Sequence, residues 1–355
     1  MRRVVVTGLG LVTPLGGDVE TSWKNILAAK SGATRITRFD PTDFACQVAC
    51  EVKPPEHEYG FDPAKRIDHK VQRQVDPFIV YGLDAAGQAL EDSGLTDMSE
   101  EERFRAGVSI GSGIGGLPGI EKESIVLHEK GPRRVSPHFV HGRLINLISG
   151  QVSIRYGLMG PNHAVVTACS TGAHSIGDAA RMIAMDDADI MLAGGAEDAL
   201  CPLGIAGFSQ ARALSTNFND QPERASRPYD KDRDGFVMGE GAGVVVLEEY
   251  ERAKARGVEA EDDERIDLPL DLVIDALARI EPVLMVRGLY LASDAALVFG
   301  RIEMGDRART APGGEDVGPR RLDITAQRSD EAPPGYDHTA HSFSPKRNRP
   351  NPLAG

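Results

Sequence analysis

One cysteine stands where its thiol could act as a nucleophile. Cys169 follows an apolar run at 163–168 and precedes a helical pattern of small and apolar residues. In a strand-to-helix turn, free N–H groups and the positive end of the helix dipole favour the thiolate, which is the nucleophilic form. The same N–H groups could stabilise an oxyanion formed from a thioester carbonyl. The alternative is a small buried cysteine at a strand end, and position alone does not separate the two.

The other cysteines do not indicate a metal centre or a disulfide framework. The sequence holds four in 355 residues, Cys46, Cys50, Cys169 and Cys201, which are too few and too scattered for such a framework. Cys46 and Cys50 lack a second pair of ligands at a suitable spacing, so loop or core cysteines are favoured over a zinc site. We expect reduced thiols, no metal and no cofactor.

A glycine-rich segment at 111–116 reads Gly-Ser-Gly-Ile-Gly-Gly and follows a predicted strand at 106–110. This is the context of a dinucleotide-binding loop. However, the region about 20 residues further on, where an acidic residue would contact a ribose, contains residues 132–135 and no acidic side chain. Close approach of the backbone at an active-site wall explains the glycines better.

Two other sequence features resemble functional motifs but are better explained by structural roles. Residues 230–235 imitate the start of a calcium-binding EF-hand loop, but the twelfth position is Gly241, where a bidentate Glu is required, and Glu240 is one place early. His174 is close enough to Cys169 in sequence to suggest a general base. Because His174 comes five residues after Cys169 along a helix, its side chain is expected to point away from the cysteine. A packing role is therefore favoured over a catalytic one.

Strands and helices alternate along the first part of the chain. Apolar and β-branched runs predict strands at 2–7, 106–110, 163–168 and 190–193. Helical patterns follow Asp18, begin at the pair Asp76-Pro77 and end at Gly94, and cover 173–183. This alternation predicts an α/β fold with a mostly parallel sheet covered by helices.

Some local features are predicted less directly. The strand at 2–7 is expected to give way to a glycine loop. Residues 236–238 and 243–247 read as a hairpin, followed by a short helix at 248–256 that Gly257 ends.

Several segments together resemble the elongating β-ketoacyl-acyl-carrier-protein synthases, in particular the type II enzyme of bacterial fatty-acid synthesis. The segments are Arg-Arg-Val-Val-Val-Thr-Gly-Leu-Gly at 2–10, the glycine-rich run at 111–116, Thr-Ala-Cys-Ser-Thr-Gly at 167–172, Ala-Gly-Gly-Ala-Glu at 193–197, Ala-Ser-Arg-Pro-Tyr-Asp-Lys-Asp-Arg-Asp-Gly-Phe at 225–236 and Gly-Glu-Gly-Ala-Gly at 239–243. The resemblance is dense through residue 257.

The resemblance implies a thiolase-like layered α/β fold whose N-terminal half is intact. It also implies a decarboxylating Claisen condensation between an acyl thioester on Cys169 and malonyl-acyl-carrier-protein. Homodimerisation through the strand before Cys169 belongs to the same expectation. By position in the matching motifs, the acyl pocket would be bordered by Ile114 and Phe208, and acyl carrier protein would be met by Lys70, Arg73 and Arg212.

Charge and hydropathy limit the partners. The formal net charge of -13 argues against general nucleic-acid binding and means that an acidic carrier protein would need a local basic patch. Residues 283–299 form the longest candidate for a membrane span, but Arg287 and Asp294 interrupt it. No signal-peptide core follows the first strand. We therefore expect a cytoplasmic protein without membrane or nucleic-acid partners.

The resemblance predicts three regions along the chain. Residues 1–257 form the ketoacyl synthase N-terminal domain, residues 258–300 are partly helical, and residues 301–355 have the Pro-, Gly-, Arg- and Asp-rich composition of a disordered tail outside the family. No recognisable C-terminal half follows. The tail contains His338 and His341, but no family motif surrounds them.

Two functions therefore remain open. The chain is either a working 3-oxoacyl synthase or a condensation-inactive fragment that binds or accepts an acyl group. The abrupt end of the resemblance favours a shifted reading frame or a rearrangement after Gly257 over gradual divergence.

Overall fold

The computed structural model describes residues 1–258, all within the first of two compact units, Met1–Met304. The regions predicted at 258–300 and 301–355 lie outside the described residues, apart from residue 258.

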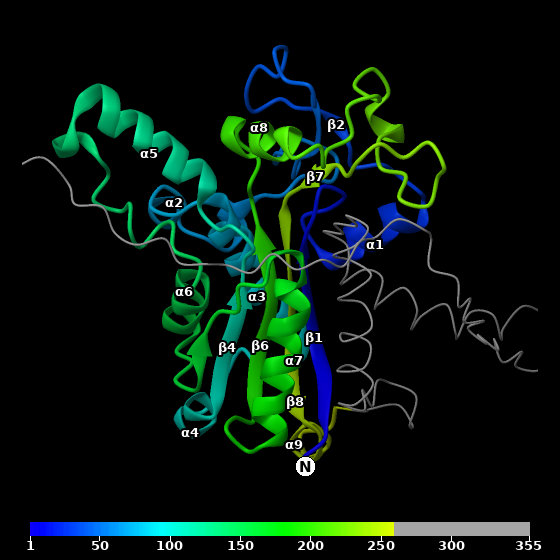
Figure 1. Cartoon of the computed structure of the whole chain (residues 1–355). Helices are drawn as coiled ribbons and strands as arrows, with labels where there is room; N and C mark the ends of the chain where they lie inside the picture. Colours follow the sequence, from blue (N-terminus) through cyan, green and yellow to red (C-terminus); the bar gives the residue numbers. More distant parts are fainter. Residues whose placement is uncertain (259–355) are drawn as a thin grey trace, which may run out of the picture. The chain divides into compact units, whose positions relative to one another are not determined.

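A five-stranded sheet forms the centre of the described part of the chain (Figure 1). Its order is β1-β8-β6-β4-β5, with the bounds Val4–Val12, Gly241–Glu249, Ile190–Glu197, Ala106–Gly111 and Asn162–His163. β6, β4 and β5 pair in parallel, whereas β8 is antiparallel to both β1 and β6. All strands of this sheet except β8 thus run in one direction, which confirms the mostly parallel arrangement.

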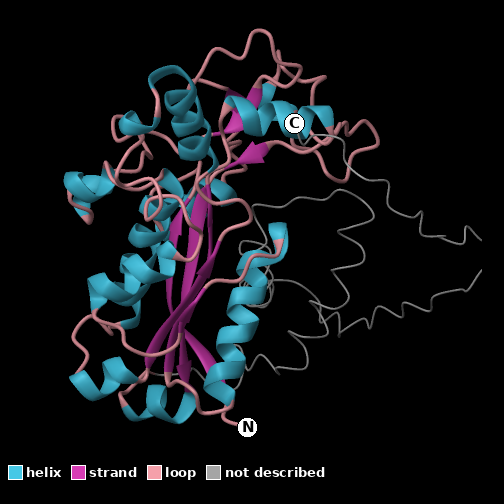
Figure 2. Cartoon of the chain, turned by 60° about the vertical axis from the view of Figure 1, so that its left-hand side comes forward, coloured by secondary structure: helices cyan, strands magenta, loops and turns pink. Residues whose placement is uncertain are grey.

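Helices cover both faces of this sheet (Figure 2). One face carries α3 (Pro77–Ser93) and α6 (Leu147–Tyr156), and the other carries α7 (Thr171–Ala184). Along β6, Leu192 belongs to the core cluster under α3, and its neighbours Met191 and Ala193 belong to the cluster under α7. This is the period-two pattern of a strand that is buried on both faces.

The predicted helix limits at α3 are confirmed. Asp76 precedes Pro77 at the first helical position, and Gly94 ends the helix with a φ of 70°. Pro is suited to the first turn because its missing N–H would have no partner there, and Gly adopts the left-handed conformation at little cost. α1 (Val19–Leu27) likewise starts from Asp18, whose side chain accepts a hydrogen bond from the Thr21 N–H.

The glycine loop predicted after residue 7 is wrong, because β1 continues to Val12. A Cβ atom at Gly8 would collide with the carbonyl oxygen of Ala89, and one at Gly10 with that of Ala85. These glycines let α3 lie directly on the strand, so they serve close backbone approach and not a turn.

The predicted hairpin is also wrong, because its two strands belong to different sheets. β7 (Met238–Gly239) pairs with β3 (Val48–Cys50) in a three-stranded sheet completed by β2 (Thr34–Arg35). β8 begins at Gly241 and enters the central sheet. Gly241 has a φ of 145° and lies against the Val12 carbonyl, so a side chain has no room where the chain changes sheets.

The remaining helices are short or lie at the ends of the sheet. They are α2 (His69–Gln72), α4 (Glu100–Phe104), α5 (Leu117–Lys130), α8 (Pro202–Gln210) and α9 (Tyr250–Ala255). α9 starts two residues later than expected, because Glu248 still belongs to β8 and the Glu249 side chain caps the helix by accepting from the Arg252 N–H. Among residues 1–258, no helix combines the length and apolarity needed to cross a membrane.

Candidate active site

Cys169 lies in a sharp turn at the carboxyl ends of the parallel strands. The strand predicted at 163–168 is wrong beyond His163, where β5 ends. The 3₁₀ turn η3 (Ala168–Ser170) follows, and α7 begins at Thr171. Ahead of the turn, the Thr167 N–H donates to the Thr171 Oγ1 at 2.9 Å, a local hydrogen bond in place of one to a neighbouring strand.

The backbone of this turn adopts an uncommon conformation. Ala168 has a φ of 53°, in the left-handed region that non-glycine residues rarely enter. Such conformations concentrate at functional sites, where the surrounding structure holds them in place. Cys169, the next residue, is exposed at the start of the helix, as a nucleophile must be.

Glycines bring this turn against the sheet. A Cβ atom at Gly111, the last residue of β4, would collide with the Val165 carbonyl, and one at Gly172 would lie 3.5 Å from the Gly195 backbone nitrogen. The collision at Gly111 leaves no space for a side chain at the end of β4, whereas a Cβ atom at Gly172 would lie at ordinary van der Waals distance from the backbone of β6. The close approach gives a physical reason for glycine at 111, and a Cβ atom at Gly195 would lie a tight 3.2 Å from the Gly172 Cα.

The segment 112–115 wraps around one carboxylate. Glu197, at the end of β6, accepts hydrogen bonds from the Gly113 N–H at 2.6 Å, the Ile114 and Gly115 N–H groups at 3.1 Å each, and the Ser112 hydroxyl at 2.9 Å. Burial raises the pKa of Glu197, and the four hydrogen bonds oppose that shift. The N–H groups that a nucleotide phosphate would need are thus donated to a side chain of the same chain.

Ile114 lies on the loop that borders the nucleophile turn, and Phe208 lies apart from it on α8 (Pro202–Gln210). A Cβ atom at Gly113 would lie 3.2 Å from the Ala168 carbonyl oxygen, so the loop borders the turn, and Ile114 on that loop is 38% exposed. Phe208 lies on α8, where its ring meets that of Phe236 at 5.5 Å in a T-shaped contact. Its core cluster also includes Leu117, the first residue after the loop.

The three basic residues predicted to meet a carrier protein are exposed. Lys70 lies on α2, Arg73 directly follows that helix, and Arg212 follows α8 with a φ of 56°. Both helices lie toward the end of the central sheet at which β4 and β6 finish (Figure 1).

His174 makes a hydrogen bond across the turn. Its Nδ1 atom lies 2.8 Å from the Thr167 Oγ1, so the ring links the first turn of α7 to the residue before η3. The ring therefore reaches back to the turn, so the expectation that it points away from the turn is wrong, and a packing role stays a prediction.

The other cysteines are less accessible than Cys169. Cys46 and Cys201 are buried, and Cys50 is half-buried. Burial raises the pKa of Cys46, and it raises the pKa values of Cys50 and Cys201 to about 11. Fewer of these thiols are ionised near neutral pH, which makes them poor nucleophiles.

Sequence reasoning missed a buried charge cluster near this end of the sheet. We define the Arg38 cluster as Arg38, Tyr81, Asp198 and Glu240. Arg38 donates to both Asp198 oxygens at 2.9 and 3.1 Å, to the Tyr81 hydroxyl at 2.9 Å and to the Glu240 carboxylate at 2.6 Å. Burial, and then repulsion from Asp198, raise the pKa of Glu240 to about 9.

This cluster holds backbone segments as well as charges. The Val52 N–H donates to Glu240 and the Leu200 N–H to Asp198, so the two carboxylates hold the backbone after β3 and after β6. The sequence analysis also did not predict a role for Glu197, although an acidic residue at the end of an apolar strand could have indicated one. No local pattern could have indicated Arg38, because its partners are 43 to 202 positions away in sequence.

The segment that imitates an EF-hand has a structural use. Asp234 accepts hydrogen bonds from the Ser215 hydroxyl at 2.6 Å and from the Thr216 and Asn217 N–H groups at 2.8 Å each. Within the described residues, no group of three or more His, Cys, Asp or Glu side chains could hold a metal ion.

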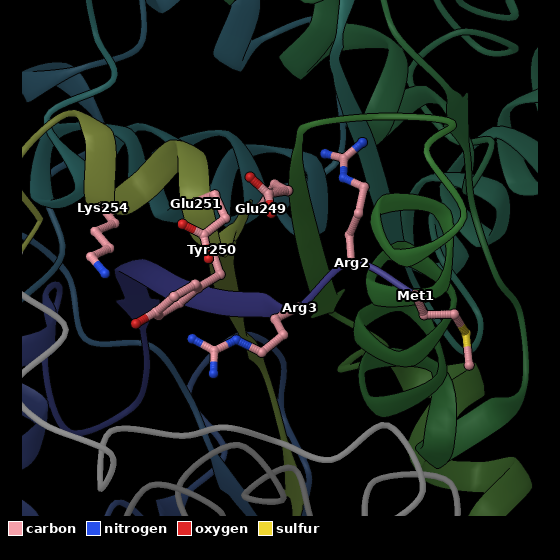
Figure 3. A pocket seen from close by; sticks show the side chains of 7 residues that line it. All are labelled: Met1, Arg2, Arg3, Glu249, Tyr250, Glu251 and Lys254. Atoms are coloured by element: carbon pink, nitrogen blue, oxygen red, sulfur yellow. The ribbon is translucent and has the colours of Figure 1, made fainter.

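A surface hollow of about 540 Å³ lies at the opposite end of the sheet (Figure 3). It lies where β1 begins and α9 starts, and the Arg3 guanidinium stacks over the Tyr250 ring at 3.5 Å. Its lining residues are Met1, Arg2, Arg3, Glu249, Tyr250, Glu251 and Lys254. β4, β6 and α7 contribute no residue to this lining, so the hollow is separate from the Cys169 site.

The exposed cysteine, the glycine loop and the layered sheet define a ketoacyl synthase domain. The chain belongs to this family, because residues 1–253 match the model of the beta-ketoacyl synthase N-terminal domain. Among curated proteins it is 56% identical over 258 residues to 3-oxoacyl-[acyl-carrier-protein] synthase 2 of Rhizobium meliloti, covering 72% of this chain and 61% of that protein. The corresponding synthase of Vibrio cholerae is 58% identical over 256 residues, covering 72% and 60%.

Solved structures show the same thiolase-like α/β fold. A beta-ketoacyl synthase from Burkholderia phymatum superposes with a TM-score of 0.64 at 33% identity, covering 73% of this chain and 62% of that one. A type II PKS ketosynthase in complex with its acyl-carrier protein gives 0.61 at 31% identity, covering 72% and 60%. The chain spans about 60% of the length of these relatives.

Proposed function

We propose that this chain accepts an acyl group on Cys169 as the first half-reaction of a 3-oxoacyl-[acyl-carrier-protein] synthase of fatty-acid biosynthesis. The observation that carries the proposal is the exposed cysteine between a left-handed Ala168 and the N-terminus of α7. A thiolate at a helix N-terminus is stabilised by the helix dipole, and the N–H groups there suit a thioester oxyanion.

The acylation step is an exchange of thioesters. The Cys169 sulfur attacks the thioester carbonyl carbon, and the new carbon–sulfur bond forms as the bond to the carrier sulfur breaks. The carrier leaves as a thiol after taking up a proton, so no oxidant or metal is consumed. In the second half-reaction, malonyl-acyl-carrier-protein would lose carbon dioxide, and the carbon left behind would form a carbon–carbon bond to the acyl carbonyl as the bond to the Cys169 sulfur breaks and the thiolate is released.

Ile114 and Phe208 are proposed to border the acyl chain. This agrees with the position of Ile114 on the loop beside the turn and with the apolar cluster that contains Phe208. The exposed Lys70, Arg73 and Arg212 are proposed to meet an acidic acyl carrier protein, which the chain's own negative charge would otherwise repel. A homodimer and a cytoplasmic location belong to the same proposal.

A second candidate is an acyl-accepting domain that does not complete the condensation. It is favoured by the extent of the similarity, which covers 256–258 residues and about 60% of the length of the two relatives. Acylation needs the nucleophile turn, whereas general acid–base residues each add roughly 10²–10⁴-fold to a reaction of the condensation type. The first half-reaction can therefore persist where the second does not.

One experiment tests the proposal and separates the two candidates. The full chain is incubated with acyl carrier protein carrying a radiolabelled acyl group, and transfer is measured before and after malonyl-acyl-carrier-protein is added. We expect label on the wild-type chain and none on Cys169→Ala. Labelled 3-oxoacyl product would support the complete synthase, and stable label without product would support the acyl-accepting domain. No transfer to the wild-type chain would contradict both.

A further inference from the structure

His138 and His141 bring two imidazole rings together outside the Cys169 turn and the Arg38 cluster. The His138 Nδ1 and His141 Nε2 atoms lie 3.0 Å apart, and the rings meet edge to face with their centroids 4.9 Å apart. Both residues are half-buried. Imidazole nitrogen is the commonest protein ligand of transition metals and suits Zn²⁺, Cu²⁺ and Ni²⁺. The pair therefore presents two metal-binding atoms at one point.

The local backbone explains why the two rings meet. The Gly142 N–H donates to the His138 carbonyl at 2.9 Å, which closes one turn of helical type. Residues three positions apart on such a turn are neighbours on the same face. The pairing of His138 with His141 thus follows from their spacing in the sequence and from this turn.

Hydrogen bonds fix both ends of the turn to longer helices. Ahead of it, the Ser136 N–H donates to the buried Glu123 carboxylate of α5 at 2.9 Å, and the Ser136 Oγ accepts from the His138 N–H at 3.1 Å. Behind it, the Gly142 carbonyl accepts from the Asp76 N–H, at the start of α3, at 3.0 Å. Ligand groups on an ordered backbone lose less conformational entropy when they bind.

The distance between the two nitrogen atoms fits a metal chelate. With metal–nitrogen bonds of about 2.0–2.1 Å, two ligands at a right angle lie about 2.9 Å apart, and two tetrahedral ligands lie about 3.3 Å apart. The observed 3.0 Å is closer to the right angle, which is typical of square-planar and tetragonal Cu²⁺ or Ni²⁺.

Binding an ion changes the tautomer of one ring. In the hydrogen bond between the rings, one nitrogen carries the proton and the other accepts it. The donor ring moves this proton to its other nitrogen, so both facing atoms then have a lone pair and no net charge is lost. A small rotation of the rings directs both lone pairs at the ion.

We propose that His138 and His141 chelate a divalent transition metal ion, Cu²⁺ or Ni²⁺, with water in the remaining coordination positions. Within residues 1–258, no group of three or more His, Cys, Asp or Glu side chains could hold a metal, so the pair acts alone. Binding is therefore weaker than at sites with three or four protein ligands. This inference is independent of the proposed acyl transfer to Cys169.

The test measures how nickel chloride protects individual histidines of the full chain from diethyl pyrocarbonate, which modifies neutral imidazole. The reaction is run near pH 8, where imidazole is mostly neutral, and the modified residues are mapped by mass spectrometry. Nickel is used because Cu²⁺ oxidises exposed thiols such as that of Cys169. Mapping also separates this pair from His338 and His341, which have the same spacing but lie outside the described residues.

We expect nickel to slow the modification of His138 and His141 by at least about tenfold, with half-protection at the same concentration, because one ion occupies both nitrogen atoms. In His141→Gln, half-protection of His138 should need roughly tenfold more nickel or higher, since the chelate has lost its second ligand. His138→Gln should have the same effect on His141. This reciprocal variant keeps the inference testable if the first variant folds poorly.

His128→Gln is the matched control. His128 is an exposed histidine of α5, so this variant also removes one imidazole but leaves the pair intact. Its half-protection concentration at His138 should stay within about twofold of the wild type. Protection of His138 that is unchanged in His141→Gln would overturn the inference, as would wild-type histidines that remain unprotected at millimolar nickel. Either result leaves acyl transfer to Cys169 intact, because the radiolabel experiment measures that separately.

Discussion

The two ends of the central sheet use charge in different ways. Where β4 and β6 begin, Arg2 and Arg105 pair with Asp186 and Asp189, and we call these four residues the amino-end cluster. The Asp186 side chain in it is 70% exposed. Toward the end where β6 finishes, the Arg38 cluster places two fully buried carboxylates against one arginine.

The two clusters differ because one consists of exposed ion pairs and the other of buried carboxylates that bind the backbone. Exposed ion pairs are weakened by water and salt and stabilise a fold only slightly. Buried carboxylates must have partners, so each fixes the backbone that supplies its hydrogen bonds. Glu197 does this in the loop that borders the Cys169 turn, the Arg38 cluster does it where β6 finishes, and the amino-end cluster does not. At the opposite end the buried carboxylate of Glu248 pairs with the side chains of Arg252 and Arg256, so buried carboxylates that accept backbone N–H groups distinguish the end where β6 finishes.

The largest expected effect is the difference in reactivity among the four cysteines. Under native conditions near pH 8, Cys169 should react with iodoacetamide on the order of 100-fold faster than Cys50 or Cys201, because thiols with pKa values of about 11 are almost fully protonated. Cys46 should be slow because it is buried. Mass-mapped labelling gives the four rates. Equal rates at all four positions would remove the evidence for a nucleophile at this end.

The next effect compares an arginine from each cluster. Arg38→Met leaves the Asp198 carboxylate buried without its cation, next to a Glu240 that is protonated near neutral pH, and should lower the free energy of unfolding by about 3–5 kcal/mol. Arg105→Met leaves Arg2 in contact with both aspartates, so this substitution should lower the free energy of unfolding by less than about 1 kcal/mol. Urea unfolding of both variants measures the difference. Equal losses of unfolding free energy in the two variants would show that burial does not determine how strongly each cluster stabilises the fold.

A smaller effect concerns pH. Because the pKa of Glu240 is raised to about 9 in the folded chain, folding binds a proton between the ordinary pKa of Glu, near 4.5, and 9. This stabilising contribution is complete below about pH 4.5 and is lost as pH rises through 9. The contribution of Glu240 to the free energy of unfolding should fall by about 2 kcal/mol from pH 7 to pH 9, a range above the pKa of Asp76, about 6.

Glu240→Gln tests that assignment, because the amide resembles the protonated acid and cannot titrate. Its free energy of unfolding should fall less steeply than that of the wild type over the same range, because only the buried thiols, whose pKa values are also raised, still contribute; the other groups of the cluster, Arg38, Tyr81 and Asp198, stay in place. Urea unfolding at pH 7, 8 and 9 gives the slopes. A Glu240→Gln slope equal to the wild-type slope would assign the titration to another group.

Local signals allowed much of this fold to be predicted, and long-range contacts account for most errors. Asp76-Pro77 and Gly94 set the limits of α3 through their own backbone preferences, and the turn at Cys169 was placed correctly. Gly8 and Gly10 were misread because a glycine has the same signature in a turn and under a close helix. The false hairpin arose because nothing local shows that β7 and β8 join different sheets.

The smallest expected effect comes from the amino-end cluster itself. Asp186→Asn removes one exposed charge while keeping the side-chain shape and a residue type that tolerates the φ of 72° at this position, so backbone strain is not added. Arg2 and Arg105 still pair with Asp189. The free energy of unfolding should fall by less than about 1 kcal/mol at low salt, and the difference from the wild type should shrink at high salt because exposed pairs are screened. Urea unfolding at two salt concentrations measures both quantities. A loss above about 2 kcal/mol that persists at high salt would mean that the amino end depends on its charges as strongly as the Cys169 end does.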